Sequence, residues 1–475
     1  MRRKKRNKYA RLLGNTMIFA IGTFSSKVLV FLMMRYYTAV LSTSDFGVSD
    51  LITQTANVLI PIATVSITSG IIRFGLIRAN DRREIFSIGI VTVFCGYLFL
   101  LVLSPILGHI EKFEPYITLI YVYVLTSSLQ QVCHQFVRAL GHVRLYALDG
   151  IFRTVCTIVL NIIFLSGFKF GITGYVLSII VSDVLSILAL GLIENLPSFF
   201  SLRRLNPVMA RSMLRFSFPL IFATECNWII SMSDRMFISF LRDDHELGLY
   251  SVSARIPTIM ILVSSIFIEA WQISTINDSS RAEQEDFFTK VGNVYQALVV
   301  MMVSGIILFS KVFVRLFAAP SFYEAWSFIP LLVIGSGFAC LSNFMNSIYT
   351  LEKKSGWSMI TVSIGAAMNI ALNALFIPEH GPQGAALATA ISYVTMFLIR
   401  SIHSRRYIRL RWNLPRFLFS SVVLILQCYF ILGDAPLWIP IEILLFATIV
   451  VLNADDILIA MNRLLAKFRH ANAHR

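Results

Sequence analysis

The sequence predicts an all-α polytopic membrane protein with about 14 transmembrane helices. Of its 475 residues, 56% are hydrophobic and only 14% are charged, and the mean hydropathy is +0.73. A soluble domain has about 25% charged residues, so this chain has too little polar surface to cover a water-soluble globule. The apolar runs are continuous rather than alternating, as in YLFLLVLSPILG at 97–108. Continuous runs favour helices over the strands of a barrel.

Every stretch of about 18 or more apolar residues with few charges is a candidate span. The opening MRRKKRNK and the apolar run after it resemble a signal peptide, but the run is too long and lacks a small-residue cleavage site. We therefore expect a retained first helix. The expected spans lie at about 11–37, 46–72, 85–108, 115–137, 146–167, 171–193, 212–240, 248–273, 288–316, 324–350, 356–377, 383–402, 416–433 and 436–454.

The basic residues predict the orientation of these spans. With a cytoplasmic N-terminus, about 31 of the 41 Lys and Arg residues lie in inner segments and about five in outer ones. This bias satisfies the positive-inside rule, so we expect both termini to be cytoplasmic.

The net charge and the cysteines exclude several other classes of protein. The 41 Lys+Arg and 26 Asp+Glu leave 41 − 26 = +15. Nucleic-acid-binding proteins carry such charge on soluble modules, so we expect no nucleic-acid partner. The six cysteines form no CxxC pair and the eight histidines no HExxH-like spacing, which gives no support to a metal site or a disulfide framework.

Two parts of the chain repeat each other. DFG at 45–47 corresponds to ELG at 246–248, a shift of 246 − 45 = 201 residues. LNIIF (160–164) precedes GITG (171–174), as LNALF (372–376) precedes GPQG (381–384). We expect two pseudo-symmetric six-helix lobes at 1–200 and 201–405, followed by two extra helices and a basic cytoplasmic tail at 406–475. Repeats with the same topology are a transporter architecture, with the substrate path between the lobes.

The phrases ELGLYSVSARI (246–256) and LNALFIPEHGPQGAALATAISY (372–393) resemble those of the polysaccharide flippases. These belong to the multidrug/oligosaccharidyl-lipid/polysaccharide exporter superfamily. The resemblance implies a transporter, not an enzyme, that moves undecaprenyl-pyrophosphate-linked oligosaccharides across the bacterial cytoplasmic membrane by alternating access. It implies membrane lipids and glycan polymerase or assembly proteins as partners. The last two helices resemble the pair that, in peptidoglycan-precursor flippases, forms a groove for the polyprenyl tail.

A lipid phosphate that crosses a bilayer needs cationic partners, because its charges are costly in hydrocarbon. Lys27 lies about halfway along the first helix, and Arg35 follows two turns outward. Arg255 lies about 10 Å below the outer end of the eighth helix. Helices one, two, seven and eight line the cavity in the resembled family, which implies that these three residues bind the headgroup. The alternatives are that Arg35 snorkels to the interface and that Lys27 pairs with an acid on a neighbouring helix.

Three further cations are candidates for headgroup capture on the cytoplasmic side. Arg73 and Arg78 close the second helix at the inner face, where snorkelling is the ordinary alternative. Arg153 stands four residues after Asp149, the spacing of an ion pair within one helix, which is the simpler interpretation.

Glu225, Asp234 and Glu269 are candidate carboxylates for ion coupling, with H⁺ or Na⁺ as the coupling ion. No other cofactor and no metal is expected. For Glu225, the alternative is a structural pair with Lys27. Asp183, between Ser182 and Ser186, is expected to be a hydrogen-bonding hub in helix packing.

Pro61, Pro219, Pro257 and Pro330 fall inside expected helices, and the first three lie in the expected cavity helices. Because proline removes a backbone hydrogen bond and kinks a helix, these three are candidate hinges. Proline is also common in membrane helices without such a role.

Two other functions remain open. A cation-coupled multidrug exporter of the same superfamily should have an acidic and aromatic cavity, whereas several of the deep charges here are cations. A membrane-embedded glycan polymerase or ligase needs a sizeable outer loop with catalytic Arg or His, and the outer connections here are short.

Overall fold

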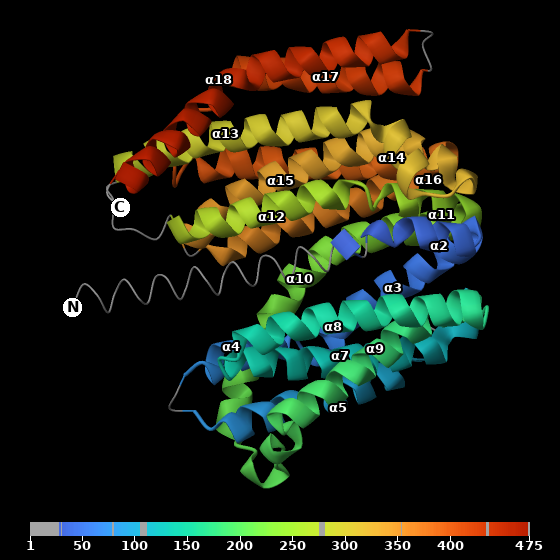
Figure 1. Cartoon of the computed structure of the whole chain (residues 1–475). Coiled ribbons are helices and arrows are strands. Elements are labelled where there is room, and N and C mark those ends of the chain that lie inside the picture. Colours follow the sequence, from blue (N-terminus) through green and yellow to red (C-terminus); the bar gives the residue numbers. More distant parts are fainter. Residues whose placement is uncertain are drawn as a thin grey trace. The chain divides into compact units, whose positions relative to one another are not determined.

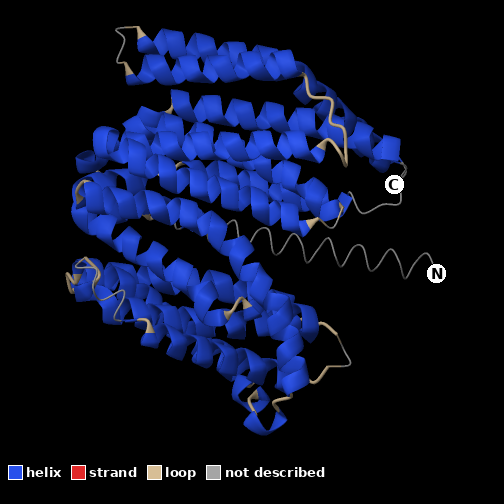
Figure 2. Cartoon of the chain, turned by 180° about the vertical axis from the view of Figure 1, so that it is seen from behind, coloured by secondary structure: helices blue, strands red, loops and turns tan. Residues whose placement is uncertain are grey.

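A computed structural model of the chain describes residues 28–29, 31–77, 80–104, 112–274, 281–352, 354–433 and 437–473. All regular structure within these ranges is helical, and they contain no strand (Figure 2). The fold class expected from the hydropathy is therefore confirmed. The chain divides into two compact units, Met1–Met236 and Phe237–Arg475.

The first unit begins with the short helix α2 and ends within the long helix α10. In it, α7, α8 and α9 pack side by side, and α3 packs on α5 and α7 (Figure 1). Its elements are α2 (Met34–Val40), α3 (Thr43–Thr64), α4 (Ile67–Gly75), α5 (Arg82–Val102), η1 (Glu114–Tyr116), α7 (Ile117–Ala139), α8 (Val143–Asn161), the π-helical turn η2 (Ile162–Gly167), α9 (Gly171–Glu194), η3 (Leu196–Phe199), η4 (Leu202–Arg204) and α10 (Pro207–Leu241).

The second unit is built around α15 and α16, and the two last helices pack on α13 (Figure 1). Its elements are α11 (Asp244–Ser253), α12 (Pro257–Ser274), α13 (Arg281–Leu308), α14 (Ser310–Phe317), η5 (Pro320–Phe328), α15 (Ile329–Leu351), α16 (Ser355–Ser404), α17 (Leu414–Leu432) and α18 (Trp438–Ala473).

Helix α16 contains two of the expected spans. Gly381 separates these two spans. Its torsions, φ 55° and ψ −138°, are non-helical. The amide of Asn369 reaches the hydroxyl of Thr389 across the turn, and Arg400 reaches Thr361. These pairings show that α16 is a helical hairpin, as the separate spans 356–377 and 383–402 predicted.

Ten helices among the described residues are long and apolar enough to cross a membrane, and the bent pair α3–α4 raises the number to eleven. One of the ten, at Gly356–Ser404, covers two expected spans. The first expected span, 11–37, falls largely outside the described residues. The total of fourteen therefore stays a prediction.

The internal repeat is visible in the helix caps. Ser42 caps α3 by accepting from the backbone N–H of Asp45, and Asp243 caps α11 by accepting from that of Glu246. The two caps are 243 − 42 = 201 residues apart, which is the shift of the repeated sequence. A side-chain oxygen at this position satisfies an otherwise unpaired N–H of the first helical turn. The corresponding helices of the two repeats therefore begin in the same way.

The repeated glycine motif also folds alike in both units. Gly171 and Gly381 each have φ 55°, a torsion that glycine adopts most readily. Three residues later, Gly174 packs against Phe164 and Gly384 against Phe376, the aromatic residues that end the two LNxxF segments. Asn161 and Asn373 of those segments are both buried. Each motif is thus a tight turn between two packed helices.

Candidate functional site

In the first unit, α10 runs antiparallel along the broken helix formed by α3 and α4. Near one end, a Cβ on Gly70 would lie 2.8 Å from the hydroxyl of Ser217. Near the other, the hydroxyl of Thr55 lies 3.8 Å from the sulfur of Met232. The two contacts are separated by 15 residues on each helix, from 55 to 70 on one and from 232 back to 217 on the other. Equal spacing in opposite directions is expected for antiparallel helices.

The broken helix bends by 51° between α3 and α4. Val65 and Ser66 at the break have positive φ, 50° and 48°, which is uncommon outside glycine. Pro61 lies four residues before the break, and its carbonyl accepts from the N–H of Ser66.

A buried ion pair joins the N-terminal part of α3 to the C-terminal part of α10. Nε of Arg235 donates to Oδ2 of Asp50 at 2.6 Å, and the exposed fractions of these side chains are 6% and 4%. A second nitrogen of Arg235 donates to the hydroxyl and the carbonyl of Ser231. Asp50 is seven residues from the start of α3, about 10 Å along the helix. The pair therefore lies within the apolar part of the bundle.

Asp234, the neighbour of Arg235 in the chain, is also buried, with 2% of its surface exposed. Buried charges are costly unless they are paired or hydrogen-bonded. The buried side chains of Asp50, Asp234 and Arg235 thus place two carboxylates and one guanidinium at one level of the first unit.

A second group of buried charges lies where α7, α8 and α9 meet. The carboxylate of Asp183 on α9 accepts from Nε of Arg153 on α8 and from the hydroxyl of Ser127 on α7. Asp183 is fully buried, and it is twelve residues from the start of α9, about 18 Å along the helix. The expectation of a hydrogen-bonding hub at Asp183 is confirmed.

Asp149 forms the adjoining half of this group. Its Oδ2 lies 2.6 Å from Nδ1 of His134, and its Oδ1 accepts from the hydroxyl of Ser186 at 2.7 Å. The amide of Gln130 donates to both Asp149 and Ser186. The ring of His134 stacks on Tyr146, with centroids 3.8 Å apart.

The formal charges of this group do not balance. The carboxylates of Asp149 and Asp183 and the guanidinium of Arg153 sum to −1. His134 completes the group as the hydrogen-bonding partner of Asp149.

The structure corrects the interpretation of Arg153 as the partner of Asp149 within one helix. Arg153 pairs with Asp183 on the next helix, and Asp149 pairs with His134. The sequence pattern alone could not reveal this, because the i,i+4 spacing is equally compatible with both choices of partner.

The remaining cations predicted from the sequence have separate surroundings. Arg73 is exposed and lies over the ring of Phe216, 4.2 Å from its centroid. Arg35 is exposed on α2, about 8 Å before the end of that helix. Arg255 is half-buried in the second unit, within the break between α11 and α12. Lys27 and Arg78 lie outside the described residues, as do the side chains of Glu225 and Glu269, whose backbones belong to α10 and α12.

Two of the four prolines lie within helices, as expected, namely Pro61 in α3 and Pro219 in α10. Pro257 is the first residue of α12 and Pro330 lies in the first turn of α15, although both fall within longer candidate spans, Asp244–Ile268 and Pro320–Leu351. Proline is favoured in a first turn because the N–H it lacks would have no helical partner there. Pro257 therefore starts a helix just after the break at Arg255.

The second unit contains a buried cation that the sequence pattern concealed. Judged by charge alone, Arg400 belongs to the basic segment that follows it in the sequence. In the structure, however, only 1% of its surface is exposed. Its guanidinium donates to Thr361, Ser342 and the carbonyl of Ser358. It lies one turn before the end of α16, so depth within the helix, rather than charge alone, would have identified it.

The last two helices are joined to α13 by a buried hydrogen-bonded chain. The amide of Gln427 on α17 donates to Glu442 on α18 at 2.9 Å, and Gln427 accepts from Ser304 on α13 at 2.7 Å. All three side chains are fully buried. Within the described ranges, no group of three His, Cys, Asp or Glu residues is arranged to hold a metal ion.

A repeated bundle of apolar helices with charges buried inside each unit defines a polytopic membrane protein. Residues 12–272, more than half of the chain, match the family described as "Polysaccharide biosynthesis protein". The chain belongs to this family. Among curated proteins, none matches the sequence.

Solved structures of the multidrug/oligosaccharidyl-lipid/polysaccharide exporter superfamily share the fold. Lipid II flippase MurJ in an inward closed conformation is similar with a TM-score of 0.72 and 16% identity, over 94% of this chain and 100% of that one. An inward-facing multidrug resistance MATE family transporter of the superfamily is similar with a TM-score of 0.68 and 15% identity, over 82% and 98%. A superfamily transporter from Pyrococcus furiosus, described as having a binding pocket of reverse polarity, has a TM-score of 0.52 and 13% identity, over 82% and 93%. The fold expected from the resemblance is confirmed.

Proposed function

We propose that this protein is a flippase that moves a polyprenyl-phosphate- or pyrophosphate-linked glycan from the cytoplasmic to the outer leaflet, for cell-surface polysaccharide synthesis. One observation carries the proposal: a member of a polysaccharide biosynthesis family has, over 94% of its length, the fold of a flippase for lipid II. Biosynthesis of a surface polysaccharide needs a step in which a lipid-linked precursor crosses the membrane. A repeated helical bundle suits that step.

The transport cycle proposed is alternating access between two lobes. The two structural repeats, with their equivalent caps and glycine turns, support it, because transporters built from repeats work by rocking one lobe against the other. The polyprenyl tail stays in the hydrocarbon while the headgroup passes through the protein. Nothing is chemically transformed, so the protein is not an enzyme in this proposal.

The headgroup phosphates bind Lys27, Arg35 and Arg255, and Arg73 and Arg78 capture headgroups at the cytoplasmic face. Charge-assisted hydrogen bonds from Lys and Arg replace the water that a phosphate loses inside the protein. Because Arg153 is held by Asp183, its part in capture would require that this pair open. The break in the span at Arg255 supports its role, since irregular backbone at membrane depth is tolerated only inside protein or beside a water-filled cavity.

An ion gradient returns the empty transporter to its starting state. The buried Asp234 and the carboxylates of Glu225 and Glu269 are the binding groups for H⁺ or Na⁺. The protein resides in the bacterial cytoplasmic membrane with both termini in the cytoplasm. Glycan polymerase or assembly proteins receive its product.

Depletion of the protein in its own cells tests the proposal. Lipid-linked glycan should then accumulate with its sugars accessible only from the cytoplasmic side, as measured by a membrane-impermeant lectin or glycosidase. Lys27→Ala and Arg255→Ala should fail to restore export at normal membrane abundance. Arg405→Ala, an exposed cation in the loop after α16, is the matched control and should restore it. Unchanged sidedness after depletion would refute the flippase, and full export by both variants would refute the headgroup residues.

A further inference from the structure

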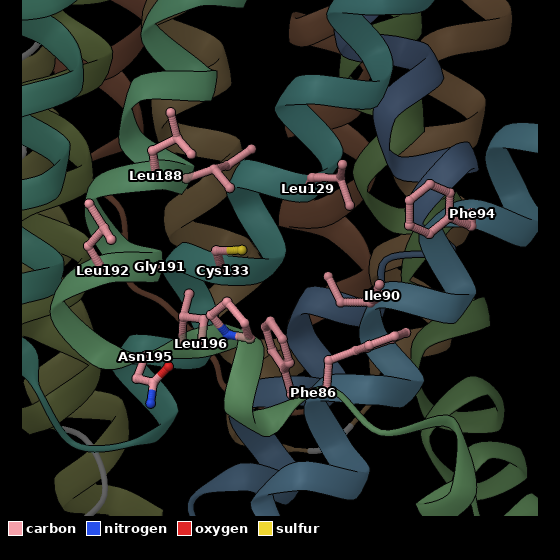
Figure 3. Close-up of a pocket in the computed structure, with 13 residues that line it drawn as sticks. Phe86, Ile90, Phe94, Leu129, Cys133, Leu188, Gly191, Leu192, Asn195 and Leu196 are labelled. Atoms are coloured by element: carbon pink, nitrogen blue, oxygen red, sulfur yellow. The ribbon is translucent and has the colours of Figure 1, made fainter.

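The first unit contains an apolar groove between α5, α7 and α9, closed at one end by the turn η3 (Figure 3). Its volume is about 520 Å³, within the range of small-molecule sites. The residues that line it are Phe86, Ile90, Phe94, Leu129, Cys133, Ile187, Leu188, Gly191, Leu192, Asn195, Leu196, Pro197 and Phe200. Asn195 supplies the one amide side chain in this lining.

The groove opens sideways rather than into the bundle. Of its α9 residues, Leu192 is 84% exposed and Leu188 is 56% exposed, and Phe94 on α5 is 47% exposed. The neighbouring exposed residues Leu98 and Ile193 are apolar too. An apolar opening surrounded by apolar surface faces lipid in a membrane protein, so the groove is accessible to hydrocarbon chains from the bilayer.

The dimensions of the groove match one leaflet. The lining residues of α5 run from Phe86 to Phe94 and those of α9 from Ile187 to Asn195. Each run covers eight residue steps, or about 12 Å at 1.5 Å per residue. Half of a hydrocarbon core of about 30 Å is about 15 Å. The groove therefore suits a chain that ends within one leaflet and is too short to enclose a much longer polyprenyl tail.

One end of the groove carries positive charge. Arg82 precedes Phe86, Ile90 and Phe94 at the same four-residue spacing, which continues the groove-lining face of α5 to the start of the helix. Arg203 follows the lining residue Phe200 by three positions. Both arginines are exposed, and neither forms an ion pair within the part of the chain that the structure describes.

The acidic side chains at this end are engaged or partly enclosed. Asp81 binds Arg204 at 2.6 Å and Glu194 lies 2.6 Å from His142, while Glu84 is half-buried. Arg82 and Arg203 therefore remain to attract a negatively charged headgroup. Because these ends of α5 and α9 are basic, they are the cytoplasmic ends by the positive-inside rule.

We propose that this groove binds one acyl chain of an anionic phospholipid from the inner leaflet. The chain lies against Phe86, Ile90 and Leu192, and the headgroup phosphate is attracted by Arg82 and Arg203. The site lies on the lipid-facing side of the first unit and uses none of the headgroup residues of the proposed function. It ties the first unit to the leaflet in which anionic lipids attract basic proteins.

Gly191 offers a sharp test because it lines the groove and a Cβ added there would have open space around it. A leucine at this position adds side-chain volume to the groove from a Cβ that meets no neighbour within 4 Å. Gly150 on α8 is the matched control, since it is also helical, also has open space around an added Cβ, and is not part of the groove lining.

The full-length protein is reconstituted in vesicles that contain phosphatidylglycerol with a photoactivatable group midway along one acyl chain. After irradiation, mass spectrometry maps the labelled peptides. We expect labelling at 86–94, 129–133 and 187–200. Gly191→Leu should reduce this labelling about tenfold, because it displaces about two methylene contacts of the acyl chain. Gly150→Leu should leave the labelling unchanged. Arg82→Gln with Arg203→Gln should remove the preference for phosphatidylglycerol over phosphatidylcholine that carries the same label.

Three outcomes would overturn the proposal. They are equal labelling in the Gly191→Leu protein, labelling spread evenly over all lipid-facing helices, and displacement of phosphatidylglycerol from these peptides by polyprenyl phosphate at equal concentration. The last result would assign the groove to the carrier lipid. The assay measures binding without transport, so its failure leaves the flippase proposal to be judged by its own experiment.

Discussion

The guanidinium of Arg235 lies 2.6 Å from the carboxylate of Asp50, although 185 residues separate the two in the chain. The pair fastens α10 to α3 about 10 Å inside the start of α3. Further along α3, the hydroxyl of Thr55 contacts the sulfur of Met232. The bend at Val65 and Ser66 lies on the far side of this fixed point. The bend therefore lies between this ion pair and the contact of α4 with α10 at Gly70 and Ser217.

Removal of one partner should be far more harmful than removal of both. Arg235→Met leaves the carboxylate of Asp50 buried without its cation, which costs about 3–5 kcal/mol. Asp50→Leu leaves the opposite charge unpaired at a similar cost. The double variant buries no uncompensated charge at this site and should unfold at a higher temperature than either single one, as measured in detergent by intrinsic fluorescence. Strict additivity of the two losses would show that the residues do not interact.

Asp183 should behave as a structural anchor for Arg153. Asp183→Asn keeps the shape but removes the charge that compensates Arg153, whose side chain is 34% exposed, so we expect a loss of about 1–3 kcal/mol. Asp286→Asn is the control, because it breaks an exposed i,i+4 pair with Lys290 worth about 0.3–0.5 kcal/mol. Thermal unfolding of both variants in detergent checks the difference. Equal stability of the two would mean that the α8–α9 pair contributes no more than an exposed ion pair.

The turn of the α16 hairpin should reject any residue other than glycine at 381. With φ 55° and ψ −138°, this position is in a region of torsions that costs other residues about 1–3 kcal/mol. A Cβ there would also lie 3.0 Å from Oε2 of Glu246. Gly381→Ala should thus lower the unfolding temperature. Gly356→Ala, which adds a Cβ in open space near the start of the same helix, should leave it equal or slightly raised, and a drop of equal size in both would contradict the argument.

The features that the sequence predicted well are those set by local chemistry. Apolar runs predict helices, and the DFG/ELG and GITG/GPQG motifs predict equivalent caps and turns, because a cap or a turn depends on a few adjacent residues. Ion-pair partners on different helices were not predicted, because such partners do not depend on adjacent residues. Asp50 and Arg235 could have been matched by their similar depths, about 10 Å from the ends of their helices. Charge alone placed Arg400 in a solvated segment, whereas its position one turn inside α16 buries it.

The ion pair between Asp81 and Arg204 predicts a pH dependence at the start of α5. The N–H of Arg83 and then the guanidinium of Arg204 hold the pKa of Asp81 below its ordinary value of 3.8. A carboxyl group with a lowered pKa stabilises the folded protein above its ordinary pKa, and this contribution is lost as the pH falls through the folded value. Because the pair is largely exposed, we expect less than about 1 kcal/mol.

Asp81→Asn isolates this charge, because asparagine caps a helix about as well as aspartate. The wild-type protein should unfold at a slightly higher temperature than Asp81→Asn at about pH 6 in detergent, where the carboxyl is ionised. The difference should shrink once the pH falls below 3.8, where the wild-type carboxyl also becomes neutral. Arg204→Gln should reproduce part of the loss near neutral pH, since the backbone N–H of Arg83 remains a partner of Asp81. A difference that persists unchanged in acid, at about pH 3, would show that the effect of the substitution is not electrostatic.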